Sequence, residues 1–396
     1  MHAKIKIRKK YMETFTVEIP ENVLDDLKFR LGNIRWPPDF ANEDWSYGTN
    51  LNELKVLCSY WQNDFDWRVQ EEKINQYENF KVDIEGIPIH FLHARGKGPQ
   101  PKPLILSHGW PWTFWDFNKL IDPLTDPVSF GGAAEDAFDV VVPSLPGFGF
   151  SSPLSKAGVN AWVTADLWDH LMRDVLGYNR YYAQGGDWGA ILTAQLGHKY
   201  AEHLYGIHLN LTFPLGFPHE SFPGLETYAS EESHWFERTA KFFAEDSGYS
   251  SIQGSRPQTL SYGMHDSPAA LAAWILEKRR SWSDSKGDVY SRFSADDLCT
   301  TFTIYWVTQT FFTSARYYYE FFADPWKPTH SERPVVKAPT SVAVFPEELF
   351  MVSKQWATEY YNLKRWMPMP HGGHFAPMEE PELLVDEIRS AFRGSS

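Results

Sequence analysis

Apolar runs and amphipathic stretches alternate along much of the chain. Residues 104–106, 140–142 and 342–345 are short apolar runs typical of strands buried on both faces, and residues 204–211 are a further strand candidate. Between such runs the apolar side chains recur at helical spacing, as at residues 162–176. This alternation predicts an α/β fold, with a mostly parallel sheet flanked by helices.

The N-terminal stretch, residues 1–80, carries a different pattern. Alternating apolar positions predict a strand at residues 15–20, followed by a helix from residue 21. Two more helical segments are predicted at residues 51–65 and 67–76. Because no catalytic combination of side chains occurs here, the apolar positions of this stretch are expected to serve packing.

A long insertion divides the predicted core. Residues 216–333 carry helical and loop signals in place of buried strands, which predicts a helical cap, and residues 381–392 predict a closing amphipathic helix. A chain of 396 residues exceeds the size at which a single core stops growing, so one domain with an insertion, or two domains, is expected. We divide the chain into an N-terminal arm at residues 1–80, a core at residues 81–215 and 334–396, and the cap.

Composition narrows the classes of function. The formal net charge of −14 opposes binding to nucleic acid, which needs a basic surface. Aromatic residues make up 16% of the chain, which predicts aromatic-lined cavities or an aromatic-rich lid unless they serve only core packing. Cys58 and Cys299 stand in neither a disulfide nor a zinc-binding spacing, so both are expected to be buried thiols in a reducing cytosol.

The basic start at residues 4–10 is not followed by the apolar segment of a secretory signal. Elsewhere no run reaches the roughly 18 apolar residues of a transmembrane helix. We therefore expect a soluble, cytoplasmic protein without a membrane partner. The oligomeric state stays open, with a homodimer as one alternative.

The sequence Gly-Gly-Asp-Trp-Gly at residues 185–189 follows a strand-forming run and precedes a helical pattern. Strand, sharp turn and helix are the context of a nucleophile elbow, whose glycines permit strained backbone. Asp187 then occupies the nucleophile position. A carboxylate that attacks saturated carbon gives a stable ester, so the expected substrate has an electrophilic sp³ carbon and a leaving group. Asp187 could equally cap the helix, because aspartate is a favoured N-cap residue.

An aspartyl ester needs a general base for its hydrolysis, and a late loop supplies His371 and His374. The order nucleophile, acid, histidine calls for a carboxylate after a strand, where Glu347 and Glu348 stand. Each of these side chains could be an ordinary loop residue, but their joint order favours catalysis. Metal binding is less expected, because no histidine pair stands with carboxylates at ligand spacing.

The chain resembles the epoxide hydrolases of the α/β-hydrolase superfamily, in the branch of the microsomal, insect juvenile-hormone and related fungal and bacterial enzymes. The resemblance covers nearly the whole chain and is specific through the combination of motifs. These motifs are Arg-Trp-Pro at 35–37, His-Gly-Trp-Pro at 108–111, Ser-Leu-Pro-Gly-Phe-Gly at 144–149, Gly-Gly-Asp-Trp-Gly at 185–189 and Gly-Gly-His-Phe-Ala at 372–376.

The resemblance implies a role for each catalytic candidate. Asp187 is the expected nucleophile, His374 the base and Glu348 the carboxylate that orients it. Backbone N–H groups of Trp110 and Trp188 are expected to stabilise the oxyanion when water attacks the ester. The implied reaction alkylates Asp187, hydrolyses the ester and releases a vicinal diol without a cofactor.

The resemblance also implies two proton-donating tyrosines in the cap, matched to Tyr249 and Tyr318. Opening an epoxide releases an alkoxide, which must be hydrogen-bonded or protonated as it forms. Tyr317 and Tyr319 flank Tyr318 and stay open as alternatives for the second donor.

The expected partner is a small-molecule substrate, a bulky apolar or aryl epoxide. Detoxification, catabolism of aromatic hydrocarbons and secondary metabolism all stay open as roles. A haloalkane-type dehalogenase is the nearest alternative, because it pairs the same aspartate nucleophile with histidine, and a non-catalytic ligand-binding protein of the same fold is the second. Membrane-anchored relatives carry an apolar N-terminal helix that this sequence lacks, so a membrane location is not expected to carry over.

Overall fold

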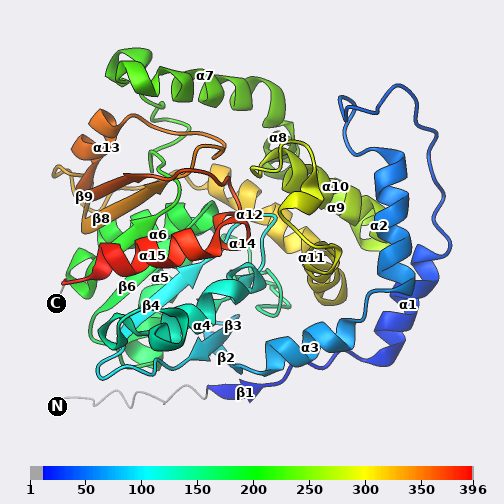
Figure 1. Cartoon of the computed structure of the whole chain (residues 1–396), viewed down its shortest axis with the longest axis horizontal. Helices are drawn as coiled ribbons and strands as arrows, with labels where there is room; N and C mark the ends of the chain where they lie inside the picture. Colours follow the sequence, from blue (N-terminus) through cyan, green and yellow to red (C-terminus); the bar gives the residue numbers. More distant parts are fainter. Residues whose placement is uncertain (1–11, 395–396) are drawn as a thin grey trace, which may run out of the picture.

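A nine-stranded sheet forms the centre of the molecule (Figure 1). In spatial order its strands are β1 (Glu13–Phe15), β2 (Glu78–Ile84), β3 (Ile87–Ala94), β5 (Phe138–Pro143), β4 (Lys102–Ser107), β6 (Tyr181–Gly185), β7 (Leu204–Leu209), β8 (Val336–Val344) and β9 (Tyr361–Pro368). From β5 to β9 neighbouring strands run parallel, whereas the pairs formed by β1, β2, β3 and β5 are antiparallel. The predicted mostly parallel α/β fold is therefore confirmed. The computed structural model describes residues 12–394, so the basic start at residues 4–10 lies outside the described part.

Helices pack on both faces of this sheet. On one face α4 (Asn118–Thr125) contacts α15 (Pro381–Phe392), and on the other α5 (Ala161–His170) contacts α6 (Trp188–Lys199) (Figure 1). The predicted closing helix at residues 381–392 is thus confirmed as α15. Helix α6 is buried from its first residue to His198 because it packs against four strands of the sheet.

The N-terminal arm contains α1 (Glu21–Leu31), α2 (Leu51–Asn63) and α3 (Trp67–Asn75). The strand predicted at residues 15–20 is wrong for most of its length, because β1 ends at Phe15. Beyond this point the backbone N–H groups of Val17 and Ile19 donate to the side chains of Asn75 and Glu71. Side chains of α3 thus replace the neighbouring strand that would have extended the ladder.

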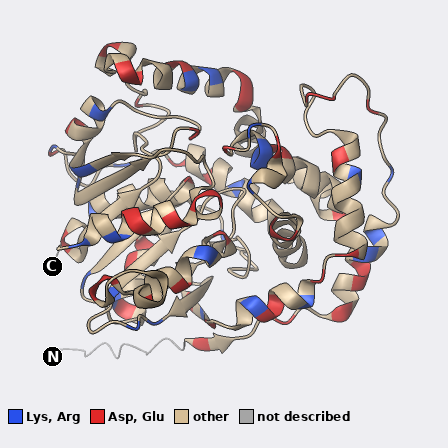
Figure 2. Ribbon diagram, viewed as in Figure 1, with Lys and Arg blue, Asp and Glu red and all other residues tan. Residues whose placement is uncertain are grey.

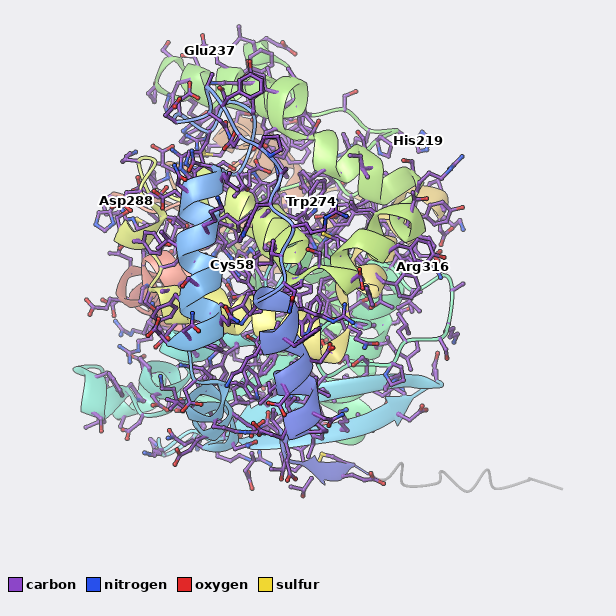
Figure 3. All side chains as sticks on the ribbon, turned by 90° about the vertical axis from the view of Figure 1, so that its right-hand side faces the viewer. Cys58, His219, Glu237, Trp274, Asp288 and Arg316 are labelled. Atoms are coloured by element: carbon purple, nitrogen blue, oxygen red, sulfur yellow. The ribbon has the colours of Figure 1, made fainter. Side chains whose placement is uncertain are left out.

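Helices fill the chain between β7 and β8, and the arm lies against them (Figures 1 and 3). Arg30 of α1 pairs with Asp266 at 2.7 Å, and the indole N–H of Trp61 in α2 donates to Thr303 at 2.9 Å. Figure 3 looks onto α1 and α2, with Trp274 of α10 behind them. The main helices here are α7 (Ser233–Lys241), α8 (Gly248–Ser255), α9 (Pro257–Asp266), α10 (Pro268–Ser281), α11 (Ala295–Thr308) and α12 (Phe311–Ala323).

Charged residues of both signs are spread along several helices, and the two cysteines lie where the sequence led us to expect them. Figure 2 shows acidic residues interspersed with basic ones along α1, α3 and α7. Cys58 and Cys299 are both free and buried, as predicted. Within residues 12–394, no helix combines the length and the apolar character needed to cross a membrane.

Candidate active site

Asp187 stands at the sharp turn between β6 and α6. Its backbone has a φ of 52° and a ψ of −128°, a region that residues other than glycine rarely adopt. A Cβ atom on Gly189 would collide with the carbonyl oxygen of Ser107, and one on Gly109 would collide with the Asp187 side chain. The Asp187 side chain makes no capping hydrogen bond to α6, so the alternative that it is a helix cap is wrong.

The Asp187 carboxylate lies between a backbone donor and a histidine. Its Oδ1 accepts the backbone N–H of Trp110 at 2.7 Å, and its Oδ2 lies 3.3 Å from His374 Nε2. Trp188 is the first residue of α6, so its backbone N–H has no acceptor within that helix. Trp110 thus supplies a peptide N–H that contacts the Asp187 carboxylate, and Trp188, the residue after Asp187, supplies a second N–H without an acceptor in α6.

His108 holds the loop that carries Trp110. Its Nε2 accepts the backbone N–H of Leu145 at 3.0 Å, while its Nδ1 lies 3.0 Å from the Gly109 carbonyl oxygen. Burial lowers the pKa of His108 to about 4, so this imidazole stays neutral and keeps an acceptor nitrogen. The first histidine of the His-Gly-Trp-Pro motif thus joins the loops after β4 and β5.

His374 bridges two carboxylates. Its Nδ1 lies 2.6 Å from Glu348 Oε1, opposite the ring nitrogen that faces Asp187, and both His374 and Glu348 are buried. Burial lowers the pKa of His374, but the charges and hydrogen bonds of Glu348 and Asp187 outweigh it and raise the pKa to about 10. The ring is therefore an imidazolium while Asp187 carries its charge.

The alternative acid and base face other partners. His371 is half exposed, with 51% of its side chain accessible, and pairs with Glu380 at 2.7 Å. Glu347 forms ion pairs with Arg238 and Lys286. Neither side chain contacts Asp187 or His374, although Glu347 directly precedes Glu348 and His371 stands three residues before His374.

Two cap tyrosines lie above the elbow. The ring of Tyr249 in α8 stacks on Trp110 at 5.1 Å, and the ring of Tyr318 in α12 meets Trp188 edge-on at 4.7 Å. Their own centroids are 5.8 Å apart. Burial, reinforced by the Asp187 charge, raises the pKa of both hydroxyls well above the ordinary value, so both stay protonated.

The neighbouring tyrosines have other surroundings. The hydroxyl of Tyr317 donates to Thr164 at 2.8 Å, and Tyr319 is 42% exposed. Of the three consecutive tyrosines, Tyr318 is therefore the one whose ring contacts both Tyr249 and Trp110.

Comparisons with known proteins match this architecture over nearly the whole chain. The model for "Epoxide hydrolase N terminus" matches residues 12–117, and that for "alpha/beta hydrolase fold" matches residues 102–381. Epoxide hydrolase 1 of Oryctolagus cuniculus is 39% identical, over 94% of this chain and 87% of its own. The chain belongs to the epoxide hydrolase family.

Other members of the epoxide hydrolase family are similar in both sequence and structure. Juvenile hormone epoxide hydrolase 2 of Ctenocephalides felis is 35% identical over 96% of this chain and 85% of its own. The crystal structure of juvenile hormone epoxide hydrolase from the silkworm Bombyx mori superimposes with a TM-score of 0.86 at 28% identity, covering 98% of this chain and 95% of that one. The similarity in sequence and in structure therefore extends over nearly the whole chain.

A narrow aromatic cavity of about 70 Å³ opens beside Asp187 in this epoxide hydrolase family member. Most of its wall is apolar, and Ser247 and Ser250 are its polar side chains apart from Asp187 and the tyrosines. Composition predicted an aromatic cavity, but the sequence did not show which phenylalanines build it. The phenylalanines of the wall are Phe213, Phe217, Phe242, Phe243, Phe321, Phe322 and Phe350.

A larger groove lies elsewhere, between the arm and the start of α10. It has a volume of about 740 Å³, and its lining includes Trp36, Tyr47 and Ala270 but none of the side chains around Asp187. It is therefore not the reaction site. Within residues 12–394, no cluster of His, Cys, Asp and Glu side chains has the composition of a metal site.

Proposed function

We propose that this protein hydrolyses an epoxide to a vicinal diol through a covalent ester on Asp187. The observation that supports this most directly is the position of the Asp187 carboxylate, which lies 3.3 Å from the buried His374 ring and beneath two buried tyrosines. The family relatives named as epoxide hydrolases support the same reaction.

In the first step, a carboxylate oxygen of Asp187 attacks an epoxide carbon and the carbon–oxygen bond of the ring breaks. Tyr249 and Tyr318 hydrogen-bond the ring oxygen, and one of them transfers its proton as the alkoxide forms. An alkoxide is a stronger base than a phenolate, so the transfer is favourable even where burial raises the pKa of both tyrosines. The products are an alkyl ester and a tyrosinate.

In the second step, alkylation itself prepares the base. The ester on Asp187 is neutral, so one of the two negative charges that raise the pKa of His374 disappears. His374 then releases its proton, which restores the tyrosine, and the neutral ring takes a proton from the attacking water. The Trp110 and Trp188 N–H groups bind the developing oxyanion, and Glu348 stabilises the returning imidazolium.

The cavity favours a flat, apolar substrate, for which we propose an aryl epoxide. At about 70 Å³ it is smaller than most ligand pockets, which measure roughly 300–1,000 Å³. Phenylalanine side chains of the wall must therefore turn aside to admit a bulky molecule. In this proposal the cap, residues 216–333, supplies the tyrosines and the core supplies the other catalytic groups. The arm, residues 1–80, braces the cap through its described part, in which Arg30 and Trp61 contact cap residues. The two buried free thiols fit the reducing cytoplasm in which we place the protein.

The test is a substrate panel. Styrene oxide, a cyclic epoxide and an aliphatic epoxide are each assayed for diol, with haloalkanes of similar size assayed for released halide. We expect diol from epoxides, fastest with styrene oxide, and no halide. Halide release without diol would assign the protein to the dehalogenases instead.

A further inference from the structure

The cap loop that follows α10 contacts the loop of the proposed base. The backbone N–H of His374 donates to the Trp282 carbonyl oxygen at 3.0 Å, and that of Gly372 donates to Asp284 Oδ2 at 3.0 Å. Gly373 lies against the same cap loop, because a Cβ atom there would stand 2.8 Å from Asp284 N and 2.9 Å from Trp282 O. Three consecutive residues around the base are thus fixed by two residues of the cap.

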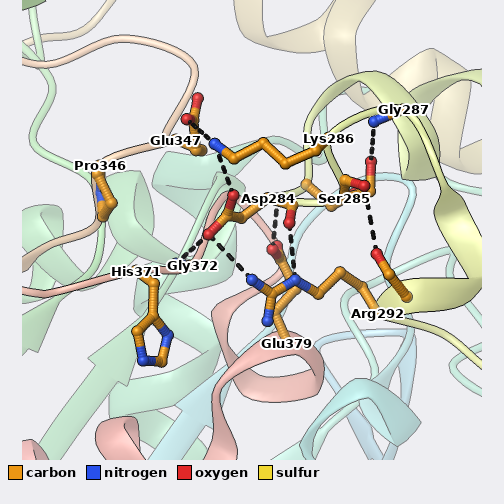
Figure 4. A network of polar contacts seen from close by, with 12 residues as sticks. Asp284, Ser285, Lys286, Gly287, Arg292, Pro346, Glu347, His371, Gly372 and Glu379 are labelled. Carbon is orange, nitrogen blue, oxygen red and sulfur yellow. Dashed lines mark hydrogen bonds and ion pairs between the residues drawn. The ribbon is translucent and has the colours of Figure 1, made fainter.

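Asp284 stands at the centre of a network of charges (Figure 4). It is 7% exposed and pairs with Lys286 at 2.9 Å and with Arg292 at 3.0 Å. Burial raises the pKa of Asp284, but the Gly372 N–H and Lys286 outweigh this and lower it. The carboxylate is therefore ionised, and it holds the backbone of Gly372 as a charged acceptor.

Glu379 extends this network to the other side of the base. One of its oxygens accepts the Asp284 N–H at 2.7 Å, and the other accepts the Phe375 N–H at 2.8 Å. The backbone of His374 is consequently tied down on both sides, through Gly372 to the Asp284 side chain and through Phe375 and Glu379 to the Asp284 main chain.

The network also reaches the loop of the proposed acid. Lys286, which pairs with Asp284, forms a second ion pair with Glu347, the residue before Glu348. The backbone N–H of Glu347 donates to the Gly372 carbonyl oxygen at 3.1 Å. Asp284 is therefore connected to both loops whose side chains meet at the 2.6 Å contact between His374 and Glu348.

We propose that Asp284 is a positioning residue for hydrolysis of the ester, because it holds the base loop in register with the acid loop. The proposal rests on the covalent mechanism proposed above. Ring opening uses Asp187 and the two tyrosines, and the bonding partners of Asp284 are Gly372, Glu379, Lys286 and Arg292 instead. Asp187 meets the base loop only through the His374 side chain, at 3.3 Å. Ester hydrolysis, in contrast, needs the His374 ring at a fixed distance from both Glu348 and the ester carbon.

The two half-reactions are compared in single-turnover experiments on Asp284→Ala, Asp284→Asn and the wild type. Asp288→Asn is the matched control, because Asp288 lies in the same loop, is exposed and accepts the Tyr290 N–H instead. We expect Asp284→Ala to slow ester hydrolysis roughly ten- to a hundredfold while ring opening changes less than about threefold. Asp284→Asn keeps an oxygen for the Gly372 N–H and should lose less, and Asp288→Asn should match the wild type.

Melting temperatures separate positioning from folding. A merely structural role predicts a lower Tm with both half-reactions slowed by one factor, and this result would overturn the proposal. Ester hydrolysis at the wild-type rate in a folded Asp284→Ala variant would also overturn the proposal. If the alanine variant does not fold, the same result in Asp284→Asn would overturn it. If the wild type forms no ester on Asp187 at all, the covalent mechanism itself fails, which the same time courses reveal.

Discussion

Replacing the two cap tyrosines tests whether the reaction depends on proton donors, as the opening of an epoxide does and the release of a halide does not. Tyr249 and Tyr318 line the cavity beside Asp187 with ring centroids 5.8 Å apart, and we expect the epoxide oxygen to be within reach of both hydroxyls. Each of the changes Tyr249→Phe and Tyr318→Phe removes one hydrogen bond to a developing alkoxide. Such a bond contributes roughly 1.5–3 kcal/mol, or about ten- to a hundredfold in rate when it forms mainly in the transition state.

The double variant should lose more than the product of the two single effects, because it leaves the alkoxide without a donor. Rapid-quench measurement of ester formation gives the ring-opening rate, and decay of the ester gives hydrolysis, which should change little. Tyr319→Phe, an exposed tyrosine in the same helix, serves as the matched control. Ester formation at the wild-type rate in the double variant would remove both tyrosines from the mechanism.

Three further results follow from the charges and the cavity. Glu348→Gln should slow ester hydrolysis and move its pH midpoint downwards, because the Glu348 charge raises the pKa of His374; an unchanged pH–rate profile would contradict this. Pairing with the two carboxylates raises the pKa of His374 from its ordinary value of 6.5 to about 10 in the folded protein. This pairing therefore stabilises the fold fully below pH 6.5, and its contribution is lost as the pH rises towards 10. Denaturant unfolding should therefore show the destabilisation by Glu348→Gln shrinking over this range. Phe350→Ala should raise kcat/KM for bulky epoxides relative to styrene oxide, since Phe350 forms part of the cavity wall. An unchanged ratio of the two kcat/KM values would show that Phe350 does not determine which substrate size the cavity admits.

The elements set by local sequence were predictable. The elbow at Asp187 follows from glycines around an aspartate between strand and helix, and α15 follows from apolar spacing after a proline. The order of nucleophile, acid and histidine along the chain pointed to the loops of Glu348 and His374, and the resemblance to the epoxide hydrolases selected these two residues over Glu347 and His371. These signals need only a few neighbouring residues each, so a single sequence contains them.

Elements set by distant contacts were not predictable. β9 has no strand pattern in the sequence, because Lys364 and Arg365 interrupt its apolar positions. As the edge strand it pairs with β8 alone. β1 ends at Phe15 because side chains of α3 accept the next backbone donors, those of Val17 and Ile19. Asp284 stands in no recognisable sequence motif. The positioning role that we propose for it depends on the contact between a cap loop and the loop of His374. Such contacts join residues far apart in the chain.

The covalent ester on Asp187 is tested most directly by intact-protein mass spectrometry of His374→Gln. This variant keeps the nucleophile and both tyrosines but lacks the base, so it should react with styrene oxide and then stall. We expect a mass increase of one substrate molecule per chain, which peptide mapping places on Asp187, and which is absent from a companion variant that also carries Asp187→Asn. An unmodified protein, when the wild type converts the same epoxide to diol, would contradict the mechanism.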